Sequence, residues 1–384
     1  NGLITTVDSN VPRLEYPLID GVVSGCPSLL LEDESINLIT YSEDLSSGFF
    51  NENTSELLNV IISPDGTLNA DKLVENNTND RHELYSGTLS FSGTSSISFF
   101  AKAEQRRYIS VFFGGNPSSG GATFDVQDGF VSLTSGGTDA SIVNYGNGWY
   151  RCSLTSTAAA TNRIYYCLRT DANAVSVQAY QGDGTSGMYL WGFQAEVGQS
   201  YPTSYIKSNG SPTTRQAETC NGAGNAATFN DSEGVLMAEI SVPFNPSNQI
   251  VSLSDSTNSD IIFIQFTPSN MFVKTSTGGV ETTVHSQNYE VKTPYKISVK
   301  YNGANAVAYI NGFISSSGSV ALPGSFTLGL SKLNFDYPTG IFDFYGKTKQ
   351  LQYYNSALTD SELEQLTSWT SFSDMANGQQ YSII

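Results

Sequence analysis

Apolar and polar residues alternate along short stretches of this chain, and this alternation is its strongest structural signal. Ile97, Phe99 and Ala101 recur at every second position of 96–103, and the same period marks 189–196. A period of two is typical of a strand that buries one face of a sheet. Turn-forming residues separate such stretches, and no 3.6-residue helical period lies between them. The pattern therefore predicts antiparallel sheets and argues against a parallel α/β sheet.

The second half of the chain shows similar short strands and a distinct hairpin signal. Its predicted strands are 234–240, 261–266, 295–301 and 306–310. Asn311 and Gly312 follow the last of these, and Asn-Gly is the dipeptide most typical of a two-residue hairpin turn. One helix is predicted near the end, where Thr359 has the properties of an N-cap and Glu362 those of its capping-box partner.

A polar joint at 207–215, which contains glycine and proline, divides the two strand-rich halves. Such joints are typical of domain boundaries. We therefore expect an all-β protein with two antiparallel β-sandwich (jelly-roll) domains in tandem and a short helix near the C-terminus. The first domain is expected at 27–215 and the second at 216–384, after a lead-in segment at 1–26.

The net charge of the chain restricts the classes of partner that it can bind. The 384 residues include 36 Asp and Glu against 18 Lys and Arg, which gives a net charge of −18. This charge repels phosphate backbones and anionic membranes, so we expect no nucleic acid partner. No apolar run approaches the roughly 20 residues that a spanning helix needs, so we expect no membrane insertion. With 39% hydrophobic and 12% aromatic residues, the chain is able to build cores.

Four cysteines are too few for a disulfide framework in a chain of this length. They lack the spacing of a zinc site. Cys152 and Cys167 lie in predicted strands, where free cysteine is typically a buried core residue. Cys26 and Cys220 each lie near a predicted domain edge and could form a disulfide, although spacing alone does not fix such a pairing.

Seven motifs in the first half occur in the order known from one family. They are PSLLLE at 27–32, NLITYSEDL at 37–45, SPDGTLNADKL at 63–73, FFAKA at 99–103, GWYRC at 148–152, YLWGFQAE at 189–196 and YPTSYI at 201–206. From 27 to 215, this order resembles a jelly-roll domain common in bacteriophage tail and other virion surface proteins. More distantly, the layout is similar to carbohydrate-binding modules of cellulose- and xylan-degrading enzymes. The resemblance implies a virion-surface or extracellular location and a homo-oligomer, for example a trimer.

The second half is similar to laminin-G-like, concanavalin A-type sandwiches. The motifs are YKISVKY at 295–301, VAYING at 307–312 and YYNSALTDSEL at 353–363. The resemblance makes calcium a possible cofactor, since such domains often bind it through loop aspartates and backbone oxygens. Asp255 and Asp260 are weak candidate ligands, too few alone for a full coordination shell, and solvated carboxylates are the alternative. No other cofactor is implied.

Aromatic residues beside turns are the candidate ligand platforms of a glycan-binding sandwich. Sugars present an apolar ring face to aromatic side chains, while amides and carboxylates bond their hydroxyls. The candidates are Tyr145, Tyr180, Phe335 and Tyr337. Trp149 and Trp191 lie inside predicted strands, so we expect them in the core.

Catalytic signals are few. A glycosidase needs two carboxyl groups across the scissile bond, and no strand here carries the alternating Glu, Asp and Glu of the concanavalin A-type hydrolases. A polysaccharide lyase needs a Tyr or His base beside a cation, which only Arg81, His82 and Tyr85 offer together, with 106–108 as a second cluster. Sequence neighbours alone do not establish a base, however. We expect His285, in a stretch rich in Thr and Ser, to be a solvated loop residue.

Taken together, the residues and the resemblance favour a non-catalytic glycan-binding protein, for host recognition or adhesion, of a phage tail or virion appendage. Its expected partners are a polysaccharide or cell-surface glycan and other virion proteins. Two alternatives stay open. One is a polysaccharide lyase or depolymerase that acts on a cell-surface or algal polysaccharide, and the other is a purely structural virion module.

Overall fold

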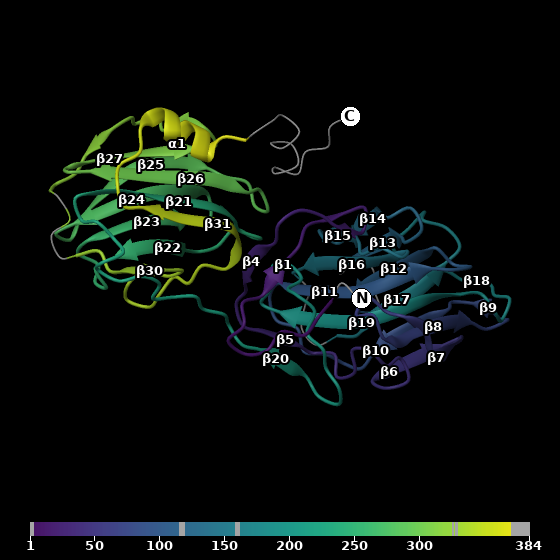
Figure 1. Ribbon diagram of the computed structural model, residues 1–384. Helices are drawn as coiled ribbons and strands as arrows, with labels where there is room; N and C mark the ends of the chain where they lie inside the picture. The colour runs from purple at the N-terminus through teal and green to yellow at the C-terminus, as the bar shows by residue number, and fades with distance from the viewer. Residues whose placement is uncertain (1–3, 115–119, 158–161, 325, 327–328, 370–384) are drawn as a thin grey trace. The chain divides into compact units, whose positions relative to one another are not determined.

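The computed structural model describes residues 4–114, 120–157, 162–324, 326 and 329–369, and they form a chain built almost entirely of strands (Figure 1). All sheets are antiparallel where their registers are defined, which confirms the predicted all-β sandwich class. Within these residues there is one helix, α1 (Asp360–Thr367). No helix of the described chain has the length and apolar character needed to cross a membrane.

Helix α1 begins where the sequence predicts. The hydroxyl of Thr359 accepts the backbone N–H of Glu362, and the Glu362 carboxylate accepts the backbone N–H of Thr359 at 2.8 Å. This reciprocal capping box satisfies backbone donors that the first helical turn leaves unpaired. The predicted helix is therefore confirmed, including its first residue.

The chain forms two compact units, each of which has its own sheets. One comprises Asn1–Asn10, Pro17–Gly25 and Glu34–Gln216, and the other comprises Val11–Tyr16, Cys26–Asp33 and Ala217–Ile384. The chain therefore passes between the units at 10/11, 16/17, 25/26, 33/34 and 216/217.

The first unit contains two six-stranded sheets, named here after a central strand. The β12 sheet has the order β14 (Phe130–Ser135), β13 (Gly121–Asp125), β12 (Tyr108–Phe113), β17 (Ile164–Arg169), β10 (Glu83–Ser86), β6 (Phe49–Glu52). The β11 sheet has the order β15 (Asp139–Asn144), β16 (Trp149–Ser156), β11 (Ser95–Ala103), β19 (Gly187–Val197), β8 (Leu68–Glu75), β7 (Thr54–Ile62). Three separate two-stranded sheets also belong to this unit. They pair β18 (Tyr180–Gln181) with β9 (Asn79–Asp80), β2 (Leu18–Ile19) with β3 (Val22–Val23), and β20 (Thr213–Arg215) with β5 (Ser35–Asn37).

One hydrophobic core joins the two sheets of the first unit. The Tyr166 ring from β17 lies 5.2 Å from the Phe99 ring of β11 and 5.0 Å from the Phe193 ring of β19, edge to face in both pairs. All three side chains are at most 1% exposed. Edge-to-face pairs of this kind add to the burial of large apolar surfaces, so these rings hold the sandwich together.

The second unit is also a two-sheet sandwich around a single large core. The β21 sheet has the order β1 (Leu14–Glu15), β4 (Ser28–Leu31), β31 (Gly346–Tyr354), β21 (Glu233–Ser241), β26 (Tyr295–Asn302), β27 (Asn305–Ile310), β28 (Phe313–Ile314), and β29 (Val320–Ala321) also pairs with β27. The β23 sheet has the order β25 (Val280–Asn288), β24 (Asn270–Thr277), β23 (Ile261–Phe266), β22 (Gln249–Ser254), β30 (Lys332–Asn334).

Two short strands near the N-terminus belong to the second unit, whereas the sequence places 27–33 in the first domain. β4 pairs with β31, with Leu31 opposite Gly346, and Leu31 is 5% exposed in the core of the second unit. The Arg13 guanidinium pairs with Glu32 at 2.7 Å and with Glu218. Without β4, the edge of β31 would present unpaired backbone groups, which explains why this segment completes the β21 sheet.

The four cysteines all lie among the described residues and are free thiols. Cys152 and Cys167 are buried, as predicted, and burial raises the pKa of both thiols. Cys26 and Cys220 are exposed and unpaired, so the disulfide considered for them is not formed.

The Arg13 ion pairs lead to a test of how the N-terminal strands are held. We expect Arg13→Met to destabilise the second unit by about 3 kcal/mol, because it leaves the nearly buried Glu32 carboxylate without its cation, next to Glu218. Differential scanning calorimetry would show the transition of this unit at a temperature several degrees lower.

Lys347→Met is the matched control, because Lys347 pairs with Glu15 on the same sheet but both side chains are 42% exposed. We expect it to change stability by less than about 1 kcal/mol. Equal effects of the two variants would contradict a structural role for Arg13.

Candidate functional site

Four aromatic residues stand in register across four neighbouring strands of the β12 sheet. We call Phe50, Tyr85, Tyr165 and Phe112 the aromatic row; Tyr85 pairs with Phe50 on one side and Tyr165 on the other, and Tyr165 pairs with Phe112. The successive ring centroids are 5.5, 5.4 and 5.5 Å apart, with interplanar angles of 19°, 30° and 7°. Cross-strand aromatic pairs of this kind stabilise a sheet and also create a continuous apolar surface.

The row lies on the outer face of the sheet because side chains alternate along a strand. Its neighbours in sequence, Phe49, Leu84, Tyr166 and Val111, belong to the core of the first unit. Each of these four strands therefore sends one large residue inward and the next one outward.

The loop that follows β17 and contains Ala174 and Val175 covers the Phe112 end of the row. Phe112 is 1% exposed, and Gly121 beside it has no room for a side chain, because an added Cβ would lie 2.9 Å from Cγ1 of Val175. The loop is held by Thr123, whose Oγ1 donates to the Ala174 carbonyl at 2.9 Å.

The other end of the row is open. Phe50 is 51% exposed, and Tyr85 and Tyr165 are half-buried. The site thus consists of these three aromatic residues, which we call the open row.

Charged side chains flank the open row. The exposed Arg163 has its guanidinium carbon 5.1 Å from the Tyr85 ring centroid and 5.9 Å from that of Phe50, within cation–π range. Two positions further along the same face, Glu52 pairs across the strands with Glu83. Arg81 contacts both carboxylates, Glu52 at 2.6 Å and Glu83 at 3.6 Å.

Glu83 differs from the other carboxylates of the site because it is fully buried. Burial raises the pKa of Glu83, although the nearby Arg81 acts in the opposite direction. One carboxylate oxygen accepts from the Cys167 thiol at 3.4 Å, and the other has no hydrogen-bond partner among the described residues. A buried carboxyl group with a raised pKa therefore lies beside a surface of exposed charges and rings.

The structure does not bring Arg81, His82 and Tyr85 together as the lyase alternative requires. Arg81 and Tyr85 lie at the outer face of the β12 sheet, but His82 is 1% exposed and its ring is 4.5 Å from that of Tyr180. Burial is the largest cause that lowers the pKa of His82. His82 therefore lacks access to a substrate at the open row.

Tyr180 also lies inside the first unit, at 9% exposure, and does not present its ring at the surface. Its hydroxyl donates to the Glu75 carboxylate at 2.7 Å, and Arg106 donates two hydrogen bonds to the same carboxylate at 2.7 and 2.6 Å. Tyr180 is therefore held in a buried polar network, which accounts for its position away from the surface.

The other predicted platforms pack against cores. Phe335 is 6% exposed in the core of the second unit instead of at the surface, because its ring packs against core side chains such as Phe344, whose ring centroid is 5.9 Å away. Tyr145 is partly buried, with its ring 5.0 Å from that of Phe100. Tyr337 is partly buried, with its ring 5.9 Å from that of Phe263. Trp149 and Trp191 are 2% and 1% exposed, which confirms that they are core residues.

The candidate calcium ligands are engaged in hydrogen bonds to the backbone, Asp255 within its own loop and Asp260 with the turn between β24 and β25. The Asp255 carboxylate accepts the backbone N–H of Thr257 at 2.8 Å, and Asp260, which is fully buried, accepts that of Gly278 at 2.9 Å. Among the residues that the structure describes, no group of three or more His, Cys, Asp and Glu side chains is placed to hold a metal ion.

Sequence reasoning missed most of the open row. Phe50, Tyr165 and Arg163 were not candidates, and Tyr85 was one only for a catalytic role. The doublets Phe49-Phe50 and Tyr165-Tyr166 were the available signal, because alternation requires one member of each pair to face outward. Which strands lie side by side was not readable from the sequence, however.

No protein-family model matches the chain, and a search of curated proteins finds no match. Solved structures to which it is similar include the Ruminococcus gnavus IT-sialidase CBM40 bound to α2,3-sialyllactose, with 15% identity, a TM-score of 0.32 and coverage of 39% of this chain and 96% of that one. Domain 4 of AbnA, a GH43 extracellular arabinanase from Geobacillus stearothermophilus, in complex with arabinotriose, has 15% identity, a TM-score of 0.31 and coverage of 42% and 74%.

The mouse laminin α1 chain, domains LG4-5, has 11% identity, a TM-score of 0.28 and coverage of 74% of this chain and 88% of that one. Likenesses at these TM-scores carry no argument about the activity of this chain. A functional conclusion therefore has to rest on the site itself.

The buried carboxyl group of Glu83 leads to a pH prediction. Because its pKa is raised in the folded state, the folded chain holds this proton more strongly than the unfolded chain. Glu83 therefore lowers stability progressively as pH rises from the ordinary carboxyl range, about 4.3, through its folded pKa. We expect Glu83→Gln, which mimics the protonated form, to remove this decline and to be at least as stable as the parent at pH 7.

Urea unfolding of both proteins at intervals between pH 4 and pH 8 measures the difference. Glu15→Gln, at a half-exposed carboxylate of the second unit, is the control. A Glu83→Gln variant that loses stability relative to the parent as pH rises would contradict the prediction.

Proposed function

We propose that this protein binds glycans, and that the open row on the first unit is its binding surface. The carrying observation is the set of three accessible aromatic side chains in register, Phe50, Tyr85 and Tyr165, on the outer face of a rigid sheet. A sugar ring has an apolar C–H face, which packs against aromatic surfaces, and a rim of hydroxyl groups, which needs hydrogen-bond partners. The open row supplies the aromatic surface, and the charged groups beside it supply the hydrogen-bond partners.

The shape of the site supports a chain-like ligand. Neighbouring strands are about 4.8 Å apart, so three side chains in register extend over about 10 Å. This length accommodates more than one sugar ring along the row. A site built on strands is also more rigid than one built on loops, so little conformational entropy is lost on binding.

Charge argues for a neutral or weakly charged glycan. Arg163 and Arg81 are the cations beside the open row, but the Glu52 carboxylate pairs with Arg81 and offsets its charge. The net charge of −18 further disfavours a polyanionic polysaccharide at long range. Guanidinium and carboxylate groups remain suited to bonding sugar hydroxyls.

We further propose that the glycan belongs to a cell surface and that the chain serves host recognition or adhesion on a phage tail or virion appendage. The support is the ordered set of motifs between 27 and 215 that resembles virion surface domains. Display of several copies, as in a homo-oligomer, would turn weak binding at each site into useful avidity.

A glycan array followed by titration tests the proposal. We expect retention on neutral glycans, and a loss of about fivefold in affinity for Phe50→Ala, because an aromatic contact contributes on the order of 1 kcal/mol. Phe130→Ala is the matched control: Phe130 is 49% exposed on β14, the opposite edge strand of the same sheet, and we expect that variant to bind like the parent.

Two results would contradict this function. One is the absence of retention on any glycan, which would favour a purely structural module. The other is an equal loss in Phe50→Ala and Phe130→Ala, which would place binding elsewhere on the molecule.

A further inference from the structure

Strand β7 is rich in aliphatic residues, yet none of its nine residues is buried. It forms one edge of the β11 sheet, where it pairs only with β8 among the described residues (Figure 1). A strand of a sandwich normally buries at least one face, so this exposure requires an explanation. We call five exposed residues the aliphatic edge: Leu57, Leu58, Val60 and Ile62 of β7, at 52%, 43%, 45% and 58%, and Leu68 of β8, opposite Ile62, at 61%.

A bulge fixes the middle of β7. Its residues 58–60 lie opposite the single residue Asp71 of β8. The Asp71 carboxylate, on a side chain that is 2% exposed, accepts the backbone N–H of Asn59 at 2.8 Å and that of Leu45 at 2.9 Å. The bulge is thus anchored from the interior of the first unit, and this anchor keeps the two aliphatic side chains beside Asn59 exposed.

The composition of the aliphatic edge is that of a contact surface. The stretch LLNVII at 57–62 contains no ionisable side chain, no proline and no glycine. A six-residue apolar stretch of this kind at a sheet edge is an aggregation site unless another surface covers it. The five residues together present roughly 400 Å² of exposed surface, a patch size that marks an interaction site.

The area of the aliphatic edge fits one contact of standard size. Such a contact buries about 800 Å² on each partner, and somewhat more than half of this area is apolar. The aliphatic edge supplies nearly all of the apolar part. Polar residues at 55–56 and 65–67 flank it in sequence and would form the rim.

A second copy of the chain is the occupant that matches this edge. Each copy has a net charge of −18, so two copies repel one another unless their contact excludes charge. The carboxylates that flank the edge in sequence are already bonded, Glu56 to the Asn51 amide at 2.6 Å and Asp65 to the Ser63 hydroxyl at 2.6 Å. A two-fold axis brings the same surface of both copies together, so an uncharged edge meets an uncharged edge.

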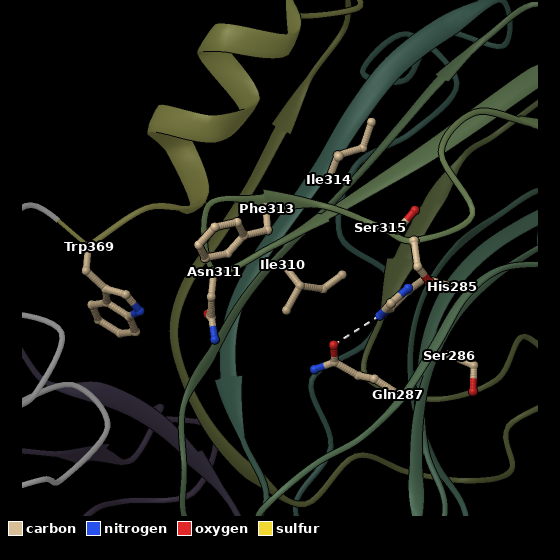
Figure 2. Close-up of a pocket in the computed structure, with 10 residues that line it drawn as sticks. His285, Ser286, Gln287, Ile310, Asn311, Phe313, Ile314, Ser315 and Trp369 are labelled. Carbon is tan, nitrogen blue, oxygen red and sulfur yellow. Dashed lines mark hydrogen bonds between the residues drawn. The ribbon is translucent and has the colours of Figure 1, made fainter.

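The second unit has a less suitable apolar surface. A depression of about 570 Å³ lies between β25 and the β27–β28 hairpin, where Phe313 and Ile314 are 75% and 50% exposed (Figure 2). The Lys296 ammonium lies 4.4 Å from the centroid of the Trp369 ring, which also lines it. His285 lies there in β25 and is 7% exposed, so the sequence prediction of a solvated loop residue is wrong. Two exposed apolar side chains near a cation suit a contact between identical copies less well than five uncharged ones.

We propose that the aliphatic edge is the contact surface of a symmetric dimer, in which the same edge of a second copy of this chain covers it. The bulge at 58–60 makes β7 a poor template for a further strand, so side chains pack across the contact and the sheet is not extended. The dimer does not depend on the proposed glycan binding, and its test uses no glycan.

Sedimentation velocity of the full chain between about 1 and 100 µM tests the proposal. We expect a monomer–dimer equilibrium with a Kd of about 10 µM or tighter, within the range of standard-size contacts. Raising NaCl from 0.05 to 0.5 M should strengthen the association several-fold, because salt screens the repulsion between two acidic copies and leaves apolar packing intact. A chain that stays monomeric at 100 µM would overturn the proposal, as would an association that weakens with salt.

Three variants locate the contact. Leu57→Glu should weaken the dimer by about a hundredfold or more, because the substitution occurs twice in a symmetric contact and places a carboxylate against aliphatic side chains. Val143→Glu is the matched control with the same change of charge, since Val143 is 45% exposed on β15, the opposite edge strand of the same sheet. Phe313→Glu is a second control, for the depression of the second unit. We expect both controls to dimerise like the parent.

The pattern across the variants is decisive. A dimer that persists in Leu57→Glu would overturn the proposal, and so would an equal loss in either control. Thermal unfolding establishes that each variant is folded. If Leu57→Glu does not fold, Leu68→Glu provides the same test from β8, because Leu68 is the most exposed residue of the aliphatic edge.

Discussion

Side chains alternate across every strand of this protein, and both the cores and the site depend on that constraint. In the β12 sheet, Tyr166 faces the core of the first unit while Tyr165 beside it faces outward in the aromatic row. The same backbone therefore stabilises the sandwich and presents a surface for a ligand. A shift of register by one residue would exchange the two faces, bury the row and expose the core.

Burial decides which aromatic residues remain for binding. Tyr180 and Phe335 lie near turns, yet one is bonded to Glu75 and the other belongs to a core, while Phe50 stays open on an edge strand. A similar selection acts on polar groups. Most find partners, and the buried side-chain atoms that find none among the described residues are spread over both units, for example at His82 and Glu83 in the first and at Thr275 and Ser298 in the second. The proposed binding surface therefore rests on the aromatic side chains that packing leaves accessible.

Motifs of a few neighbouring residues correctly predicted turns and caps. The features that the sequence did not predict depend on pairing between strands that are distant in the chain. The Asn311-Gly312 hairpin and the Thr359 cap depend on a few neighbouring residues, and both are found as predicted. The open row depends on β6, β10 and β17 lying side by side, although they are far apart in sequence. His285 was misjudged because Thr and Ser suggested a loop, whereas Thr282, Thr283 and Val284 are β-branched residues that favour a strand.

The pairing of β4 with β31 has a consequence for synthesis on the ribosome. Leu31 emerges early, but its partner Gly346 follows more than 300 residues later. At about 5–20 residues per second, β4 waits for tens of seconds without its neighbour, while the chain of the first unit is completed in between. During that interval, an apolar strand with free backbone groups is exposed to other nascent chains. A chaperone bound to 26–33 would protect it.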